Sequence, residues 1–211
     1  IDMFIVRDAS TGVPAEIARH VLPHVSILNA GESDVSHPTQ GLLDLMTILQ
    51  HKDNIGSISV AIVGDVKHSR VARSVYEALS KFGTTDIRLI GPEELLPKKG
   101  FEGARRYTAL SDGILDADVV MALRIQRERF AEKGTIPNPR EYFQRYGLTE
   151  ETMKNARADA IVMHPGPINR DVEINGSLAE GPRSVIAKQV TNGMAVRMAV
   201  LALAHEHSHD N

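Results

Sequence analysis

The chain has 211 residues, with 24 Lys and Arg against 27 Asp and Glu, so its formal net charge is −3. That balance argues against a general nucleic-acid binder, and the absence of Cys excludes a disulfide scaffold, a thiolate zinc site and a cysteine nucleophile. A chain without Cys suits a reducing compartment, so we expect a cytoplasmic protein. No membrane partner is expected, because the apolar runs fall short of the roughly 20 residues that a membrane helix needs.

Short apolar runs alternate with helical patterns along the chain, which is typical of a parallel α/β architecture. The predicted strands are 4–6, 25–28, 59–63, 87–90, 118–123 and 160–163. The predicted helices are 14–21, 39–50, 69–82, a short one opening at Ser111, 138–146, 150–156 and 185–205. Pro14 suits an early helical position, Gly83 suits a helix end, and Thr149 suits an N-cap.

Two helices carry apolar stripes that predict which face is buried. In 39–50 the stripe is Leu42, Leu45, Met46 and Leu49, and in 185–205 it is Val190, Met194, Met198 and Leu201. We expect the second helix to pack back on the first part of the chain.

The sequence predicts two lobes of parallel sheet flanked by helices, with the first lobe incomplete. A polar stretch at 51–56 marks the boundary. Residues 1–50, together with the C-terminal helix 185–206, would form the first lobe, and 51–184 would form the second. Because Ile1–Val6 is already a strand-like run without an initiator Met, we expect the polypeptide to be part of a longer one.

Polar residues follow the predicted strands, where ligands of open parallel sheets bind. These residues are Arg7, the run 29–40 with His37 and Gln40, the run 64–70 with Arg70, Arg124 with Gln126, and the turn 164–167 (HPGP). Arginine forks match the geometry of carboxylates and phosphates, so the expected ligand is anionic.

Each of these positions has a simpler structural explanation. Arg7 and Arg124 could be surface charges at strand ends, and His37 could merely precede a helix that starts at Pro38. Arg70 opens a helix, where the helix dipole disfavours a cation, and 164–167 could be a rigid connector. Their shared position at strand ends favours a common site.

Other candidate sites are weaker. His20 and His24 have metal-like spacing, but Pro23 breaks the helix that would align them. The turn after strand 59–63 lacks both the dinucleotide and the Walker glycine patterns. The His-rich tail 205–210 is explained by a solvated terminus. We therefore expect neither a metal nor a cofactor.

Together, these turns resemble the catalytic chain of aspartate carbamoyltransferases. The resemblance rests on four segments and runs from Ile5 through the final helix: 37–44 (HPTQGLLD), Gly64-Asp65 with Arg70, 124–129 (RIQRER) and 164–167 (HPGP). The first is typical of carbamoyltransferases generally. The last two favour the aspartate enzyme over the ornithine enzyme, which typically has a cysteine in the last turn.

The resemblance implies roles for the matching residues. Arg7, His37 and Gln40 would bind carbamoyl phosphate, with His37 polarising the carbonyl oxygen, Arg7 and His37 being the catalytic pair, and Gln40 contacting the carbamoyl amide. Backbone carbonyls around Gly166 and Pro167 would receive the carbamoyl NH2. Arg70 and Arg124 would hold the carboxylates of L-aspartate, with Gln126 nearby.

The family also implies parts that this sequence lacks: a Ser-Thr-Arg-Thr phosphate-binding turn and a loop with a catalytic lysine donated by a neighbouring subunit. The implied assembly is a homotrimer with shared active sites, with regulatory or dihydroorotase-type chains as further candidate partners. The alternatives are a truncated or degenerate non-catalytic homologue acting as an assembly scaffold, and a carbamoyltransferase for another amine.

Overall fold

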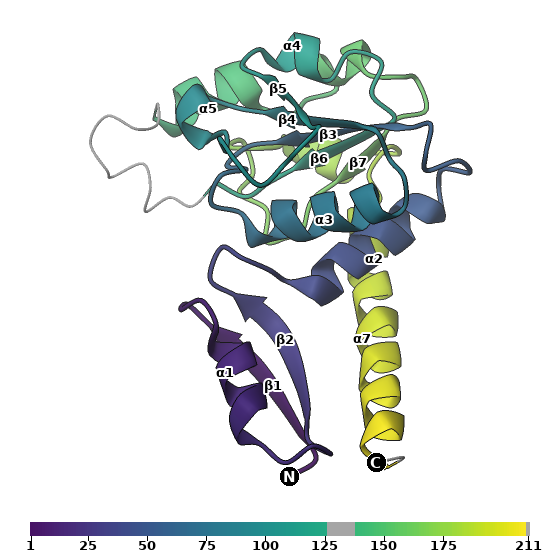
Figure 1. The fold of residues 1–211 in the computed structure, drawn as a ribbon. Helices are drawn as coiled ribbons and strands as arrows, with labels where there is room; N and C mark the ends of the chain where they lie inside the picture. Colours follow the sequence, from purple (N-terminus) through teal and green to yellow (C-terminus); the bar gives the residue numbers. More distant parts are fainter. Residues whose placement is uncertain (126–137, 210–211) are drawn as a thin grey trace.

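The computed structural model describes residues 1–125 and 138–209. Its larger unit is built around a parallel five-stranded sheet with the order β5-β4-β3-β6-β7 (Figure 1). The strands are β3 (Ser59–Val63), β4 (Asp86–Ile90), β5 (Arg105–Tyr107), β6 (Val119–Ala122) and β7 (Ile161–Met163). The predicted α/β architecture with parallel strands is confirmed.

Helices cover both faces of this sheet, and the alternation of side chains along β3 explains how. Val60 and Ile62 join the core under α2 (Pro38–Leu49) and α3 (Arg70–Lys81). Ala61 and Val63 point to the other core. That core is closed by the helices and turns α4 (Leu110–Gly113), α5 (Pro139–Tyr146), η3 (Thr152–Asn155) and α6 (Gly176–Ala179). A strand buried on both faces reads as a continuous apolar run, as β3 does.

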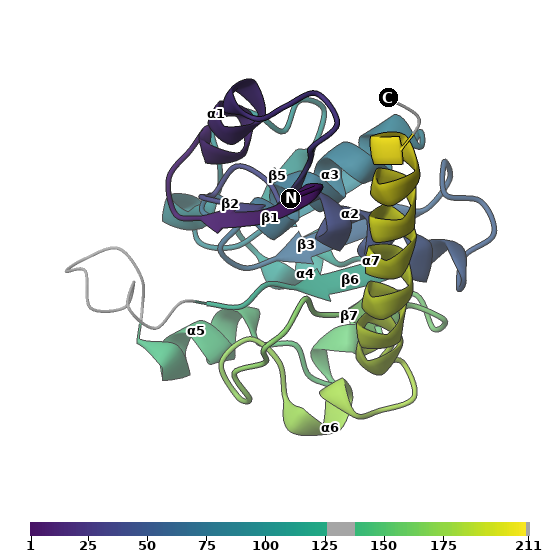
Figure 2. The same ribbon diagram turned by 90° about the horizontal axis from the view of Figure 1, so that it is seen from below.

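The smaller unit is a β-α-β segment in which β1 (Met3–Asp8) pairs in parallel with β2 (Ser26–Glu32) through α1 (Val13–His20). The pair lies below the larger unit in Figure 1 and in front of it in the view from below (Figure 2), and β2 contacts α2. The sequence treats β1 as a core strand, but Phe4 and Ile5 are 37% and 63% exposed in the described chain. No described helix combines the length and apolarity of a bilayer-spanning segment.

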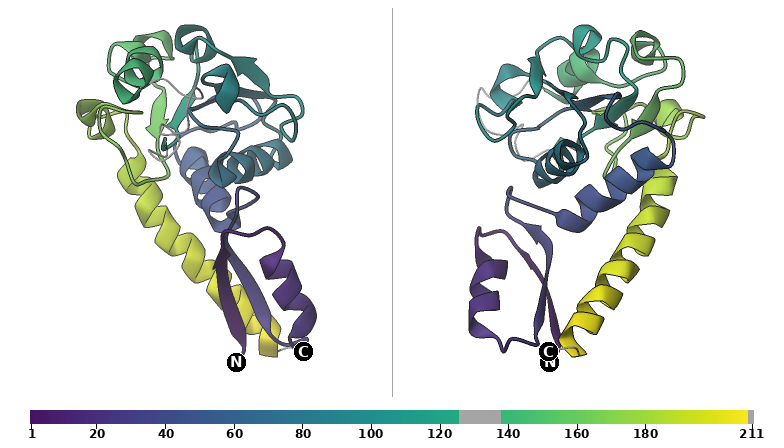
Figure 3. Two further views of the ribbon diagram at one scale, coloured as in Figure 1. Left: turned by 90° about the vertical axis from the view of Figure 1, so that its left-hand side faces the viewer. Right: turned by 45° about the vertical axis from the view of Figure 1, so that its right-hand side comes forward.

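The long C-terminal helix α7 (Ile186–His209) runs back along α2 and β2, as predicted (Figure 3). The face that it buries differs from the predicted one. Val190, Met194 and Met198 are 65–70% exposed, whereas the buried side chains toward α2 include the polar Gln189 and Asn192. The α2–α7 contact therefore contains a polar seam, beside which Leu43 of α2 packs near Gly193 of α7.

The predicted apolar stripe of helix α2 is buried only in part. Leu45 lies in the core as predicted, whereas Leu42 and Leu49 are exposed, and the polar Gln40, Asp44 and Thr47 are buried. The reason is that α2 is packed between two helices, α3 and α7, and polar side chains meet polar partners on the second.

Four further elements differ from the predictions. The expected helix 150–156 is only the 3₁₀ turn η3, and its N-cap residue is Glu151 rather than the predicted Thr149. Thr149 Oγ1 still accepts from the Thr152 N–H at 3.1 Å, and the Asn155 carbonyl accepts from the Asp116 N–H at 2.9 Å. Strand β5 was not predicted, because its arginines give no apolar alternation and it lies at the sheet edge. The one-turn helix α6 and the 3₁₀ turn η1 (Glu93–Leu95) are too short to give a periodic signal.

Gly41 lets α2 approach α3 closely. A Cβ at this position would lie 2.6 Å from the Ser74 carbonyl oxygen, which is backbone and cannot turn aside. We expect Gly41→Ala to lower the free energy of unfolding by about 1 to 3 kcal/mol, measured by urea denaturation. Gly56→Ala is the matched control, because its Cβ would meet only ordinary contacts at 3.6 Å. Equal effects of the two substitutions would contradict this explanation.

Candidate active site

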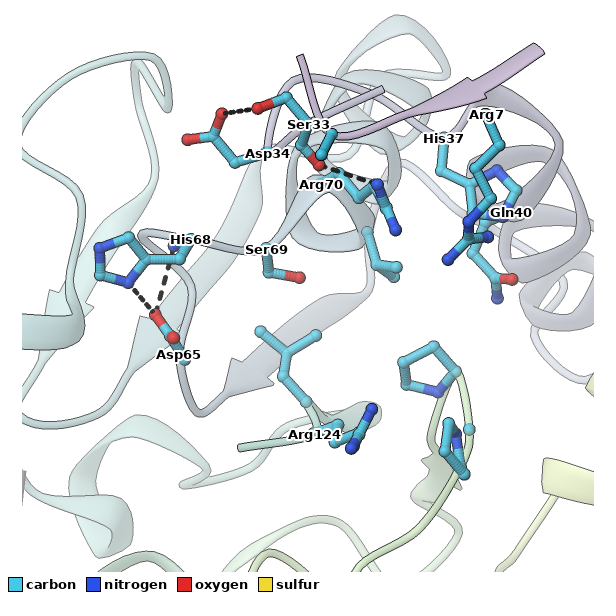
Figure 4. A pocket seen from close by; sticks show the side chains of 16 residues that line it. Arg7, Ser33, Asp34, His37, Gln40, Asp65, His68, Ser69, Arg70 and Arg124 are labelled. Atoms are coloured by element: carbon cyan, nitrogen blue, oxygen red, sulfur yellow. Dashed lines mark hydrogen bonds and ion pairs between the residues drawn. The ribbon is translucent and has the colours of Figure 1, made fainter. Parts of the chain in front are cut away.

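One cavity of about 680 Å³ collects residues from five strand ends. Arg7 lies in β1, Ser33 and Asp34 follow β2, Arg70 follows β3, and Arg124 follows β6, while Pro165, Gly166 and Pro167 follow β7 and His37 and Gln40 open α2. In Figure 4, Arg7, His37 and Gln40 lie together with Arg70 beside them, and Arg124 lies across the cavity. The structure thus places nearly all the sequence-predicted site residues around one cavity. Gln126 lies outside the described residues.

The three arginines of this cavity have no carboxylate partner among the described residues. Arg7 Nη1 donates a long hydrogen bond of 3.4 Å to the Ala30 carbonyl, and Arg70 Nη1 donates to the Ser33 carbonyl at 2.9 Å. Arg124 is exposed and bonds to no described residue. Burial and the nearby Arg7 charge both lower the pKa of Arg70. The cavity therefore holds positive charge that the described protein groups leave unpaired, as an anion site does.

Two carboxylates also line the cavity, but other groups engage them. Asp65 accepts hydrogen bonds from the backbone N–H of His68 at 3.2 Å and lies 2.8 Å from its Nδ1. Asp34 Oδ1 accepts from the Ser33 hydroxyl at 3.2 Å. These contacts hold the turns after β2 and β3.

The backbone of His37 is held by a hydrogen bond, whereas its imidazole ring has no hydrogen-bond partner among the described residues. Its N–H donates to Ser74 Oγ of α3 at 2.8 Å. No described residue bonds to either ring nitrogen, and Nδ1 is buried. Burial, and then the charges of Arg197, Arg7 and Arg70, lower the His37 pKa to about 4. The imidazole is neutral near pH 7 and can donate one N–H to a ligand.

The turn after β7 is held by a buried network. The Gly166 N–H donates to His164 Nδ1 at 2.8 Å, so His164 carries its proton on Nε2, which donates to Glu173 Oε1 at 3.2 Å. Asn169 donates from its backbone to the same carboxylate and from its side chain to the Ile125 carbonyl at 3.2 Å. This network ties the turn to the segment that carries Arg124. The Gly166–Pro167 peptide bond is cis.

Several residues that shape the site were not predicted from the sequence: Ser74, Asp44, Gln189 and Glu173. The one available signal was Asp44, a carboxylate between Leu43 and Leu45 in an otherwise apolar helix. The other three are distant in sequence from the groups they hold. No cluster of three or more candidate metal ligands occurs in residues 1–125 and 138–209.

The fold and the cavity define a protein with two parallel α/β units and an arginine-lined cavity to which both contribute residues. The chain belongs to the aspartate/ornithine carbamoyltransferase family: the carbamoyl-P binding domain of that family matches residues 1–50, and its Asp/Orn binding domain matches residues 56–204.

Solved structures of both kinds of enzyme resemble this chain. An aspartate transcarbamoylase from Trypanosoma cruzi, in complex with carbamoyl aspartate and phosphate, is 29% identical with a TM-score of 0.81; the alignment covers 95% of this chain and 65% of that one. An ornithine carbamoyltransferase from Pyrococcus furiosus is 26% identical with a TM-score of 0.82, covering 96% and 66%. One from Thermus thermophilus, at 23% identity and a TM-score of 0.83 over 97% and 67%, shares the fold. This chain thus spans about two-thirds of each.

The surroundings of His37 predict an unusual titration. We expect its imidazole to titrate near pH 4 in a nuclear magnetic resonance pH series. Because the folded pKa lies below the ordinary 6.5, folding stability should fall as the pH drops from 6.5 toward 4. Arg197→Gln removes one of the charges that lower the pKa, so the midpoint should rise. A wild-type midpoint at 6.5 would contradict this account of the site.

Proposed function

We propose that this chain transfers the carbamoyl group of carbamoyl phosphate to L-aspartate, giving N-carbamoyl-L-aspartate and phosphate, in de novo pyrimidine biosynthesis. The observation that carries the proposal is one cavity in which three arginines without a carboxylate partner in the described chain surround His37 and Gln40. Both substrates are anions, and guanidinium groups bind carboxylate and phosphate oxygens in pairs.

In this proposal the cavity has two halves. Arg7, His37 and Gln40 bind carbamoyl phosphate, and the backbone carbonyls around Gly166 and Pro167 accept hydrogen bonds from its NH2 group. On the other side, Arg70 and Arg124 bind the two carboxylates of aspartate, with Gln126 as a further contact. The arrangement of these groups around one cavity supports the division.

The reaction needs positioning and charge stabilisation. The aspartate amine attacks the carbamoyl carbon, a C–N bond forms, the C–O bond to phosphate breaks, and the proton lost by the amine leaves with the phosphate. Negative charge develops on the carbonyl oxygen during the attack. A neutral His37, as its lowered pKa requires, stabilises that oxygen by donating a hydrogen bond, and Arg7 adds positive charge.

The choice of aspartate over ornithine rests on charge. Aspartate carries two carboxylates, which match Arg70 and Arg124, whereas ornithine carries one carboxylate and a second amine. The HPGP turn, without a cysteine, supports the same choice.

The assembly in this proposal is a homotrimer with shared active sites, which rests on the family resemblance. Sedimentation equilibrium of the purified chain tests it.

The first test of the proposal is an assay of the purified protein with carbamoyl phosphate and each amine. We expect carbamoyl-aspartate to form, and ornithine to compete poorly. Product from ornithine alone would identify ornithine as the substrate instead. Because the chain spans about two-thirds of each related enzyme, the assay is repeated with a segment that carries the family's Ser-Thr-Arg-Thr turn added. Activity only on mixing would still support the enzyme, and no product under either condition would favour the non-catalytic scaffold.

Two substitutions separate the proposed roles. Arg124→Ala removes a charge-assisted contact to aspartate and should raise the KM for aspartate about 10- to 100-fold. His37→Ala removes a donor to the developing oxyanion and should lower kcat about 100-fold or more. Arg19→Ala, in an exposed ion pair on α1, is the control and should change neither constant. Wild-type kinetics in both site variants would refute the assignment.

A further inference from the structure

Directly behind Gln40 lies a carboxylate that the proposed reaction does not use. Asp44 is fully buried on α2. Gln40 Nε2 donates to both of its oxygens, at 3.1 and 3.2 Å, and Gln189 Nε2 of α7 donates to Oδ1 at 2.8 Å. Asp44 thus accepts the NH2 groups of two side-chain amides from different helices.

Burying this carboxylate is costly. Burial raises the Asp44 pKa to about 7, and no described Lys or Arg lies within ion-pair distance of it, although Arg197 acts on it from farther away. A buried acid without a salt bridge destabilises a fold relative to an apolar side chain. The Asp44 carboxylate therefore has to supply a property that an apolar side chain at the same position would lack.

That property is the ability to accept hydrogen bonds without donating any. An ionised carboxylate bonds only to donors, so each glutamine must turn its NH2 toward Asp44 and its carbonyl oxygen away. The Gln189 Oε1 then accepts the His164 N–H at 2.9 Å, at the start of the 164–167 turn. The Gln40 Oε1 bonds to no described residue, and Gln40 lines the cavity. One carboxylate thus sets the direction of both amides.

We propose that Asp44 is a positioning residue that holds Gln40 with its carbonyl oxygen toward the cavity, as an acceptor for the NH2 group of the carbamoyl donor, and that holds the 164–167 turn through Gln189. The inference rests on the proposed function for the identity of that donor. Asp44 acts through the two glutamines and does not touch the substrate.

The competing explanation is that Asp44 only joins α2 to α7. The same seam contains Thr47, whose Oγ1 accepts from Asn192 Nδ2 at 2.8 Å, and Gln50, whose Oε1 accepts from the same amide at 2.9 Å. Thr47 does not line the cavity. Thr47→Val is therefore a matched control that weakens the seam without turning Gln40.

The test compares two ligands that differ only in the NH2 group. Phosphonoacetamide carries the amide, and 2-oxopropylphosphonate has a methyl group in its place. Calorimetry above the Asp44 pKa of about 7 should show the wild type binding the amide more than about tenfold more tightly, because Gln40 and the carbonyls around Gly166 and Pro167 each accept a hydrogen bond from the NH2 group. In Asp44→Asn, an NH2 group that donates replaces a carboxylate oxygen that accepts. Gln40 can turn its carbonyl oxygen toward this new donor and away from the cavity. Gln189 is less free to turn, because its Oε1 already accepts the His164 N–H.

The preference for phosphonoacetamide should therefore fall about tenfold in Asp44→Asn, to the share that the carbonyls around Gly166 and Pro167 supply, and persist in Thr47→Val. In a Gln40→Met background there is no amide to turn, so adding Asp44→Asn should leave the remaining preference unchanged. The full wild-type preference retained in Asp44→Asn, or equal losses in the Thr47→Val control, would overturn the inference.

Failure of the proposed function gives a different result. In that case the wild type binds neither phosphonate, and the inference is judged from the side-chain amides themselves. Nuclear magnetic resonance of the wild type should show the Gln40 and Gln189 NH2 protons protected from hydrogen exchange. Fast exchange at Gln40 would overturn the role of Asp44, whether or not Asp44→Asn folds.

Discussion

Unpaired positive charge at the meeting point of several strand ends is the constraint on which the site depends. Arg7, Arg70 and Arg124 come from three separate strand ends and face one cavity, without a carboxylate from the described chain to balance them. Backbone carbonyls hold two of the guanidinium groups, which fixes their direction but leaves their charge. An anion in the cavity would relieve the repulsion between Arg7 and Arg70, so the arrangement favours binding of anionic ligands.

Helix α2 is the element that connects this charge to the rest of the fold. Its first turn carries His37 and Gln40, its approach to α3 depends on Gly41, and its contact with α7 is made by Asp44 and Thr47. Asp44 joins α2 to α7 through Gln189, which also accepts the His164 N–H at the start of the 164–167 turn, whereas Thr47 joins the helices without lining the cavity. Residues far from the cavity in sequence, such as Gln189 on α7, thereby influence its geometry.

The sequence predicted the parts of the fold whose signal is local. Strand β3 was visible because burial on both faces requires an uninterrupted apolar run. Strand β5 was not, because an edge strand with exposed arginines needs no apolar pattern. The stripes on α2 and α7 predict the buried faces only in part, since Leu45 is buried but Leu42 and Met194 are exposed, while Asp44 and Gln189 are buried. Periodicity reports a preference for burial, whereas partner elements decide which face is covered.

The sequence by itself determined the parallel α/β class, the position of polar residues after the strands, and the family to which the motifs point. Only the tertiary structure decided which arginines lack a carboxylate partner in the described chain, that no described residue bonds to the His37 ring, and that Gln40 donates to the buried Asp44. The physical reason is the distance along the chain over which each kind of interaction acts. Backbone preferences and side-chain alternation act between near neighbours in the chain, while charge balance and hydrogen-bond direction depend on groups that only folding brings together.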